Sequence, residues 1–314
     1  MSIALPQPLP LAAPRTARRM ALSGLALAAI GAVAASGKAI IVKLAYRHGI
    51  DAMSLLALRM LVALPFFVLM GLWAARRASH RLSLADWLQV AGLGFTGYYL
   101  SSYLDFLGLA WISATLERLI LYLSPTLVML IALVVLGQRP SRRQLLALLV
   151  SYGGVLLAFG HDVAFDGRGT LIGSGLVFAG ALSYAIYLFG SGQLVARIGA
   201  LRLTAYASGI ASVLCVGQYL LARPLDGLLA FPAPVYGLSL LNGTVCTVLP
   251  VLAIMLGVKR IGPSLAAQVS MLGPVSTIAL SVWLLGEPMG LWQGLGTGLV
   301  LCGVLLVGRG AGKP

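Results

Sequence analysis

The sequence predicts an all-α integral membrane protein with ten transmembrane helices. Composition, the number of apolar segments and the placement of the basic residues each support this class. Hydrophobic residues make up 60% of the 314 positions and charged residues only 10%, and the mean hydropathy is +0.98. A soluble domain usually has about 25% charged residues. Too little polar surface is present to cover a water-soluble globule, so lipid is the expected solvent.

Ten apolar segments are long enough to span a bilayer, which takes roughly 20 residues. The first follows a basic stretch, as a signal peptide would, but it continues too far and contains no clear Ala-x-Ala cleavage site. We therefore expect it to be the first span. The expected cores are Met20–Leu44, Ser54–Ala74, Trp87–Ala110, Ser113–Leu136, Leu145–Phe159, Leu171–Phe189, Leu203–Leu221, Val235–Val258, Ser264–Leu285 and Met289–Val307.

Basic residues are unevenly divided between the loops that this count creates. If the N-terminus is cytoplasmic, the outer side holds three basic residues, Arg47, Arg168 and Arg223. The cytoplasmic side holds fifteen: Arg15, Arg18, Arg19, Arg76, Arg77, Arg81, Arg139, Arg142, Arg143, Arg197, Arg202, Lys259, Arg260, Arg309 and Lys313. Basic residues favour cytoplasmic loops. The split supports ten spans with both termini in the cytoplasm, and it explains the net charge of +14 without nucleic-acid binding.

The two halves of the chain resemble each other at a spacing of 149 positions. Pro125 then aligns with Pro274, and Leu136-Gly137 aligns with Leu285-Gly286. Five helices per half place the halves in opposite orientations, as in the inverted repeats of many carriers. Chance similarity between apolar helices is the alternative. The predicted organisation is a cytoplasmic tail (1–19), a first repeat (20–160), an external linker (161–169), a second repeat (170–308) and a cytoplasmic tail (309–314).

Both halves also resemble the drug/metabolite transporter (DMT) superfamily of the EamA type. The first half contains Ser124-Pro125-Thr126 and then Leu136-Gly137-Gln138-Arg139, and the second contains Gly273-Pro274-Val275 and then Leu285-Gly286-Glu287-Pro288. Gln138 stands where the family usually has Glu. The resemblance covers about residues 20–308. It implies a metabolite exporter or exchanger in the plasma membrane, the inner membrane of a bacterium, and it names no substrate.

Several ionisable residues fall at membrane depth, where each costs about 2.5–3.5 kcal/mol on insertion scales. With a rise of about 1.5 Å per residue, Lys38, Arg59, Asp105 and Glu117 all lie roughly 6–9 Å below the outer surface. Arg118 follows Glu117 on the same helix. Charged residues on four helices at one depth predict one shared polar site in the outer half of the membrane.

The positive charges in this group outnumber the negative ones. A surplus positive charge in a dehydrated site favours a carboxylate or phosphate on the cargo. We therefore expect an anionic or amino-acid-like substrate, with Asp105 or Glu117 binding an amine or a coupling proton. The alternative is a structural role, in which Arg59–Asp105 and Lys38–Glu117 pairs only hold helices together.

The second half has no charges at the corresponding positions. Its polar candidates for substrate binding are Tyr187, Asn242 and Gln268, to which we add Tyr122 from the first half. Pro125 and Pro274 are candidate hinges because proline removes a backbone hydrogen bond. Small residues at every fourth position of the last span, Gly290, Gly294 and Gly298, permit close helix contact and a homodimer face.

No motif indicates a cofactor, a metal site or a catalytic residue. Cys215, Cys246 and Cys302 lie in apolar runs without metal-ligand spacing. The sequence therefore predicts a secondary transporter, and not an enzyme, that moves a small polar metabolite across the lipid bilayer by alternating access. A flippase or scramblase for a lipid-linked substrate is the main alternative, and a membrane-embedded enzyme is a weaker one.

Overall fold

The computed structural model describes residues 14–78, 81–137, 142, 145–146, 149–157, 167–261, 266, 269, 272–287 and 290–310. Every regular element within these ranges is helical. The helices of the first half are α1 (Pro14–Tyr46), α2 (Ala52–Arg76), α3 (Leu84–Gly94), η1 (Phe95–Leu100), α4 (Ser101–Leu109), α5 (Ala114–Leu121) and α6 (Ser124–Leu136). Those of the second half are α8 (Arg168–Ile198), α9 (Ala200–Ala222), α10 (Asp226–Leu229), α11 (Ala233–Gly243), η2 (Thr244–Val248), α12 (Leu249–Ile261), α14 (Leu272–Leu280), η3 (Ser281–Leu285) and α15 (Leu291–Gly310).

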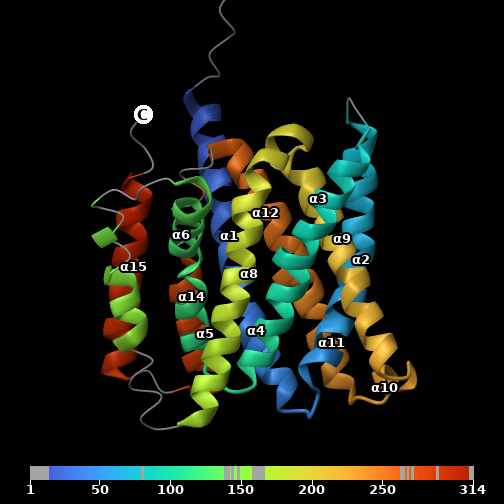
Figure 1. Ribbon diagram of the computed structural model, residues 1–314, viewed down its shortest axis with the longest axis vertical. Coiled ribbons are helices and arrows are strands. Elements are labelled where there is room, and N and C mark those ends of the chain that lie inside the picture. The colour runs from blue at the N-terminus through green and yellow to red at the C-terminus, as the bar shows by residue number, and fades with distance from the viewer. Residues whose placement is uncertain are drawn as a thin grey trace, which may run out of the picture.

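Long apolar helices stand side by side in a bundle (Figure 1). In the described residues, six helical stretches are long and apolar enough to cross a membrane, and the apolar stretch Leu272–Leu285 is shorter. The start of α1 and the end of α15 lie at the same end of the bundle (Figure 1). The six long stretches are Arg19–Tyr46, Ala52–Arg76, Ala114–Leu136, Arg168–Gly192, Ala200–Ala222 and Ala233–Ile261. The chain is therefore a multi-pass membrane protein.

Two local features recur 149 positions apart. The π-helical segment η1 begins at Phe95 and η2 begins at Thr244. Gly137 ends α6 and Gly286 ends η3, each with a left-handed backbone at φ 66° and 70° respectively. Glycine adopts this conformation without the steric cost that a Cβ brings. The aligned halves thus share backbone details that hydropathy does not show.

The contacts between helices follow the same 149-position alignment, because equivalent helices of the two halves make equivalent contacts. Helix α1 packs against α12, and α8, which aligns with α1, packs against α4, which aligns with α12. Helices α2 and α9 align with each other and are also in direct contact. Gly94 of α3 approaches the backbone of α9, and its equivalent Gly243 of α11 approaches the backbone of α2. The two halves are therefore interlocked.

The third and fourth expected spans differ in detail from unbroken α-helices. The third contains η1 between α3 and α4, and such π segments often occur at functional sites. In the fourth, Pro125 lies in the first turn of α6 instead of in mid-helix. A proline cannot donate to the carbonyl four residues earlier, and the Ser124 hydroxyl donates to that carbonyl, Leu121 O, at 2.6 Å. The chain breaks before the proline and satisfies the freed carbonyl locally.

One ion pair joins the ends of the two repeat-related helices α2 and α9. Asp51 caps the N-terminus of α2, accepting from the backbone N–H groups of Met53 and Ser54 at 3.0 and 3.1 Å. It also accepts a hydrogen bond from Arg223, which follows the last residue of α9. Partial burial alone would raise the pKa of the Asp51 carboxyl. Hydrogen bonds from the Ser54 hydroxyl and N–H and from Arg223 outweigh it, so the net pKa lies below the ordinary 3.8.

Replacing Asp51 with Asn should remove this charge but keep a capping side chain. A depressed carboxyl pKa stabilises the fold above the ordinary pKa and loses that effect as pH falls through the folded-state pKa. The pair is half exposed, so the stability difference at neutral pH should be at most about 1 kcal/mol. Thermal unfolding in detergent from pH 7 to pH 3 should show the difference shrinking as the pH falls below about 4, the ordinary pKa of an aspartate. The exposed Asp226→Asn control should show no such convergence, and an unchanged Asp51→Asn gap at acid pH would contradict the prediction.

Candidate functional site

Lys38 of α1 lies between two acidic residues from other helices. Its Nζ is 2.6 Å from Oδ2 of Asp105 on α4 and 3.6 Å from Oε1 of Glu117 on α5. All three side chains are buried or nearly so, and that of Glu117 is 0% exposed. One ammonium thus serves two carboxylates inside the apolar bundle. The structure therefore brings together three of the residues that the sequence placed at one depth.

Arg118 extends this charged cluster along α5. Its Nε is 3.9 Å from Oε2 of Glu117, which is close enough for an ion pair but too far for a hydrogen bond. Within the described part of the chain, both carboxylate oxygens of Glu117 and the Nε and Nη2 atoms of Arg118 are buried without hydrogen-bond partners. Buried polar atoms normally have partners. These atoms are therefore available to a bound molecule or to water.

Arg59 of α2 points to the second half and not to Asp105. Its Nε donates to the Thr247 hydroxyl at 2.9 Å, and its guanidinium lies over the Phe106 ring at 5.2 Å from the centroid. The Thr247 hydroxyl in turn donates to the Asn242 carbonyl at 2.7 Å. Of the two pairs expected for a structural role, Lys38–Glu117 is present, but Arg59 has this different partner.

The Arg59 contact depends on the π-helical segment η2, which carries Thr247. In π-helix the hydrogen-bond spacing is one residue longer than in α-helix, and the Thr247 hydroxyl reaches the carbonyl five residues earlier. The Asn242 side chain is fully buried, and its amide nitrogen and oxygen both lack hydrogen-bond partners among the described residues. Nη1 of Arg59 is also buried and has no hydrogen-bond partner among the described residues. This second polar group joins both halves of the chain.

The tyrosines predicted for the site lie in two different places. A Cβ placed on Gly273 would be 3.1 Å from the Tyr122 hydroxyl and 3.5 Å from the Ser36 hydroxyl oxygen. Tyr122 thus lies beside α1 and α14. Tyr187 of α8 instead shares a hydrogen bond of 3.1 Å with the Tyr98 hydroxyl. Gln268, the remaining candidate, lies outside the described residues.

The sequence analysis missed two residues that contribute to this region. Thr247 has no charge and lies in an apolar run. The only sequence signal that could have identified it is a polar side chain within an expected span. Glu287 was noted for its motif, but its contact comes from the fold. Its Oε1 accepts from the backbone N–H of Ala114 at 2.9 Å, at the start of the helix that carries Glu117 and Arg118. A carboxylate there satisfies a free N–H and complements the helix dipole.

Comparisons with known proteins place this architecture in a family. A family model described as the EamA-like transporter family matches residues 22–160 and 171–309, which is most of the chain in two repeats. The chain belongs to the EamA-like transporter family. It is therefore a transporter of the drug/metabolite superfamily, and not an enzyme.

Relatives of this EamA family member extend over nearly its whole length. The uncharacterized transporter YcbK of Bacillus subtilis (strain 168) is 35% identical over 283 residues, 89% of this chain and 91% of its own. The uncharacterized transporter YyaM of the same organism is 29% identical over 216 residues, 68% and 70% of the two chains. One solved crystal structure is 17% identical, with a TM-score of 0.60 over 92% of this chain and 97% of its own. That likeness concerns the fold alone.

Proposed function

We propose that this EamA transporter is a secondary carrier, an exporter or exchanger, for a small polar metabolite that bears a carboxylate or phosphate. The observation that carries the proposal is the buried charged cluster. Lys38 and Arg118 of this cluster lie against two anions, Asp105 and Glu117, and the buried Arg59 of the second polar group adds a third cation, which contacts Thr247 and the Phe106 ring. The unmatched positive charge and the unpartnered guanidinium atoms are suited to an anionic group, which arginine binds through several N–H donors.

An amino-acid-like cargo would use both signs of charge in this site. Its carboxylate would accept hydrogen bonds from the guanidinium groups of Arg59 and Arg118. Its amine would donate to the buried oxygens of Glu117, which have no hydrogen-bond partner in the described residues. The side-chain amide of Asn242 has a donor and an acceptor without hydrogen-bond partners in the described residues. It would bind a further polar group of the cargo. Tyr122 and Tyr187 remain predicted site residues at greater distance from these charges.

Alternating access is the mechanism that this arrangement favours. The cargo would bind where Arg59 of the first half meets Thr247 of the second, so closing around the cargo would move one half against the other. The inverted five-plus-five arrangement, with repeats at 20–160 and 170–308, belongs to the proposal. The proposal also includes ten spans, cytoplasmic termini, a plasma-membrane location and a homodimer face at Gly290, Gly294 and Gly298. The fifteen-to-three division of basic residues between the two sides supports the orientation.

A metabolite screen with matched variants tests the proposal. We would measure thermal unfolding of the purified protein with carboxylates, phosphates, amino acids and uncharged sugars, and then counterflow of the hits in proteoliposomes. A ligand that binds the folded state raises the unfolding temperature. Anionic or zwitterionic compounds should stabilise the wild type and the exposed-residue control Arg168→Gln. Arg59→Gln and Glu117→Gln should lose this response and at least about 90% of transport.

Two outcomes would contradict this assignment of the site. Variants that unfold earlier but respond to the same ligand would show that the cluster only holds helices together. Normal transport of an uncharged substrate, with no response to any anion, would show that the charged cluster does not select the cargo.

A further inference from the structure

Four hydroxyl-bearing side chains, Tyr98, Tyr187, Thr204 and Ser208, gather where η1, α8 and α9 meet, and we call them the hydroxyl cluster. The hydroxyl oxygens of Tyr98 and Tyr187 are 3.1 Å apart. The Thr204 and Ser208 hydroxyls of α9 lie next to the Tyr98 hydroxyl. The Tyr187 ring packs against the backbone of η1, since a Cβ on Gly97 would be 2.3 Å from its Cγ. All four members are polar and uncharged.

The alignment of the two halves relates the hydroxyl cluster to residues of the proposed site. At the spacing of 149 positions, Tyr187 aligns with Lys38, Ser208 with Arg59 and Tyr98 with Thr247. The Arg59–Thr247 contact between α2 and η2 therefore has an equivalent between α9 and η1. Equivalent positions of the two halves thus carry two charges in one place and only hydroxyls in the other.

The hydroxyl cluster lies toward the end of the bundle opposite to Arg59. The start of α2 meets the end of α9, where Asp51 contacts Arg223, so α9 starts at the other end of the bundle (Figure 1). Arg59 and Ser208 each lie in the first half of their helix. A path between the two ends of the bundle would therefore pass Arg59 on one side and the hydroxyl cluster on the other.

Buried hydroxyls on α9 connect these two places. Thr204, Ser208 and Ser212 are four residues apart, so they follow one face of the helix, and each is at most 9% exposed. The Ser212 hydroxyl lies 3.6 Å from the sulfur of Met60, which follows Arg59 on α2. The Ser208 Oγ is buried and forms no hydrogen bond of ordinary geometry within the described part of the chain. Buried polar atoms normally have partners, so this hydroxyl can bind a polar molecule.

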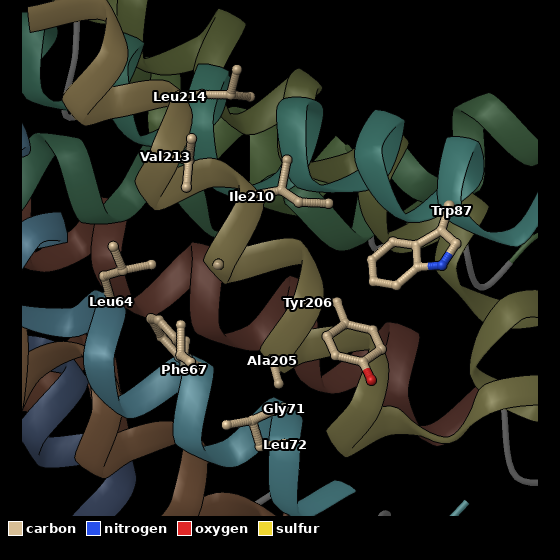
Figure 2. Close-up of a pocket in the computed structure, with 12 residues that line it drawn as sticks. Leu64, Phe67, Gly71, Leu72, Trp87, Ala205, Tyr206, Ile210, Val213 and Leu214 are labelled. Carbon is tan, nitrogen blue, oxygen red and sulfur yellow. The ribbon is translucent and has the colours of Figure 1, made fainter. Parts of the chain in front are cut away.

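The neighbouring face of α9 has a different character. Ala205, Gly209 and Val213 line an apolar groove of about 400 Å³ between α2, α3 and α9 (Figure 2). Val213 is 60% exposed, so the groove opens to the outside of the bundle, which is lipid in a membrane-spanning protein. The groove is unsuited to a polar cargo, and a polar path would follow the hydroxyl face instead.

We propose that the hydroxyl cluster is a second binding place of the cargo, which the cargo reaches as the carrier changes its orientation. On the proposed function, on which this inference rests, the anionic group of the cargo binds at Arg59. Alternating access opens the two ends of the bundle in turn around a site between the repeats, so equivalent positions face the cargo in turn. Hydrogen bonds from neutral hydroxyls are about half as strong as those from a guanidinium. The hydroxyl cluster would therefore hold the cargo weakly and release it.

Labelling with two thiol reagents of opposite charge tests this inference without a known cargo. The probes are the anionic sulfonatoethyl and the cationic trimethylammonioethyl methanethiosulfonate, and mass spectrometry of the detergent-purified protein measures the rates. Ser208→Cys, with the three native cysteines replaced by alanine, should react with both probes at similar rates. Val90→Cys is the matched control, fully buried in an apolar cluster of α3 and α9. Ser208→Cys should react at least about tenfold faster than this control, because reactivity requires access.

Native Cys246 reports on the charged side of the path when the other two cysteines are replaced by alanine. It precedes Thr247, and a Cβ on Gly37, the neighbour of Lys38, would be 3.1 Å from its Sγ. A cleft with surplus charge concentrates its counter-ion, so the anionic probe should react at least about tenfold faster than the cationic one. Equal rates at Cys246, with rapid labelling of Ser208→Cys, would overturn the anionic cargo of the proposed function but support the polar path.

Two results would overturn the proposal. Labelling of Ser208→Cys no faster than that of Val90→Cys would show that the hydroxyl cluster lies outside the path. The same preference for the anionic probe at Ser208→Cys as at Cys246 would show that the cluster does not bind as a neutral site. Circular dichroism checks that each variant is folded, and Thr204→Cys reports on the same face of α9 if Ser208→Cys fails to fold.

Discussion

Replacing Lys38 with Met is expected to abolish transport and to lower the free energy of unfolding by about 3–5 kcal/mol. The Lys38 ammonium lies 2.6 Å from the Asp105 carboxylate and 3.6 Å from that of Glu117. Without it, two buried carboxylates would face each other in the apolar bundle with only Arg118 nearby. Denaturant unfolding in micelles, followed by circular dichroism, measures the stability, and counterflow in proteoliposomes measures transport.

A charge-balanced double variant separates the loss of stability in Lys38→Met from its loss of transport. Lys38→Met/Asp105→Asn removes one charge of each sign and leaves Glu117 beside Arg118, so most of the lost stability should return. Transport should not return, because the proposed site has lost two of its polar groups. The exposed Lys259→Met control should match the wild type in both assays. Wild-type stability of the single Lys38→Met variant would refute the buried ion-pair network.

Replacing Gly94 with Ala is expected to destabilise the protein by about 1–3 kcal/mol, the usual range for overpacking. A Cβ at Gly94 would lie 2.6 Å from the backbone oxygen of Ala207 on α9. Backbone atoms cannot move aside as a flexible side chain does, so α3 and α9 would have to separate. The repeat predicts the same result for Gly243→Ala, since a Cβ there would lie 2.8 Å from the backbone oxygen of Arg59 on α2.

Two glycines on the same helices provide controls for these substitutions. Gly92 of α3 and Gly237 of α11 have no atom within 4 Å of an added Cβ. Alanine at either position should leave stability unchanged or raise it by up to about 1 kcal/mol, because alanine is the better helix former. Melting of Gly94→Ala at the temperature of Gly92→Ala would contradict the close crossing. A large loss at Gly94 with none at Gly243 would contradict the equivalence of the two halves.

Much of the helical arrangement follows from local sequence. The expected cores Met20–Leu44, Ser54–Ala74 and Leu203–Leu221 fall within α1, α2 and α9, because hydropathy over about 20 residues depends on nothing outside the segment. The interruptions were harder to anticipate. The π segments have no strong composition signal, and the position of Pro125 in a first turn depends on the break before it.

The charged cluster shows which features local sequence does not determine. The sequence by itself determined the membrane class, the alignment of the two halves and the presence of Lys38, Asp105 and Glu117 within apolar segments, because these follow from residue type and spacing along the chain. Only the tertiary structure decided which side chains meet. Arg59 reaches Thr247, 188 positions away, because ion-pair and hydrogen-bond partners depend on how each helix is rotated and shifted against its neighbours. Those two degrees of freedom are determined by packing across the whole bundle, including the close glycine contacts, and leave little trace in any single helix.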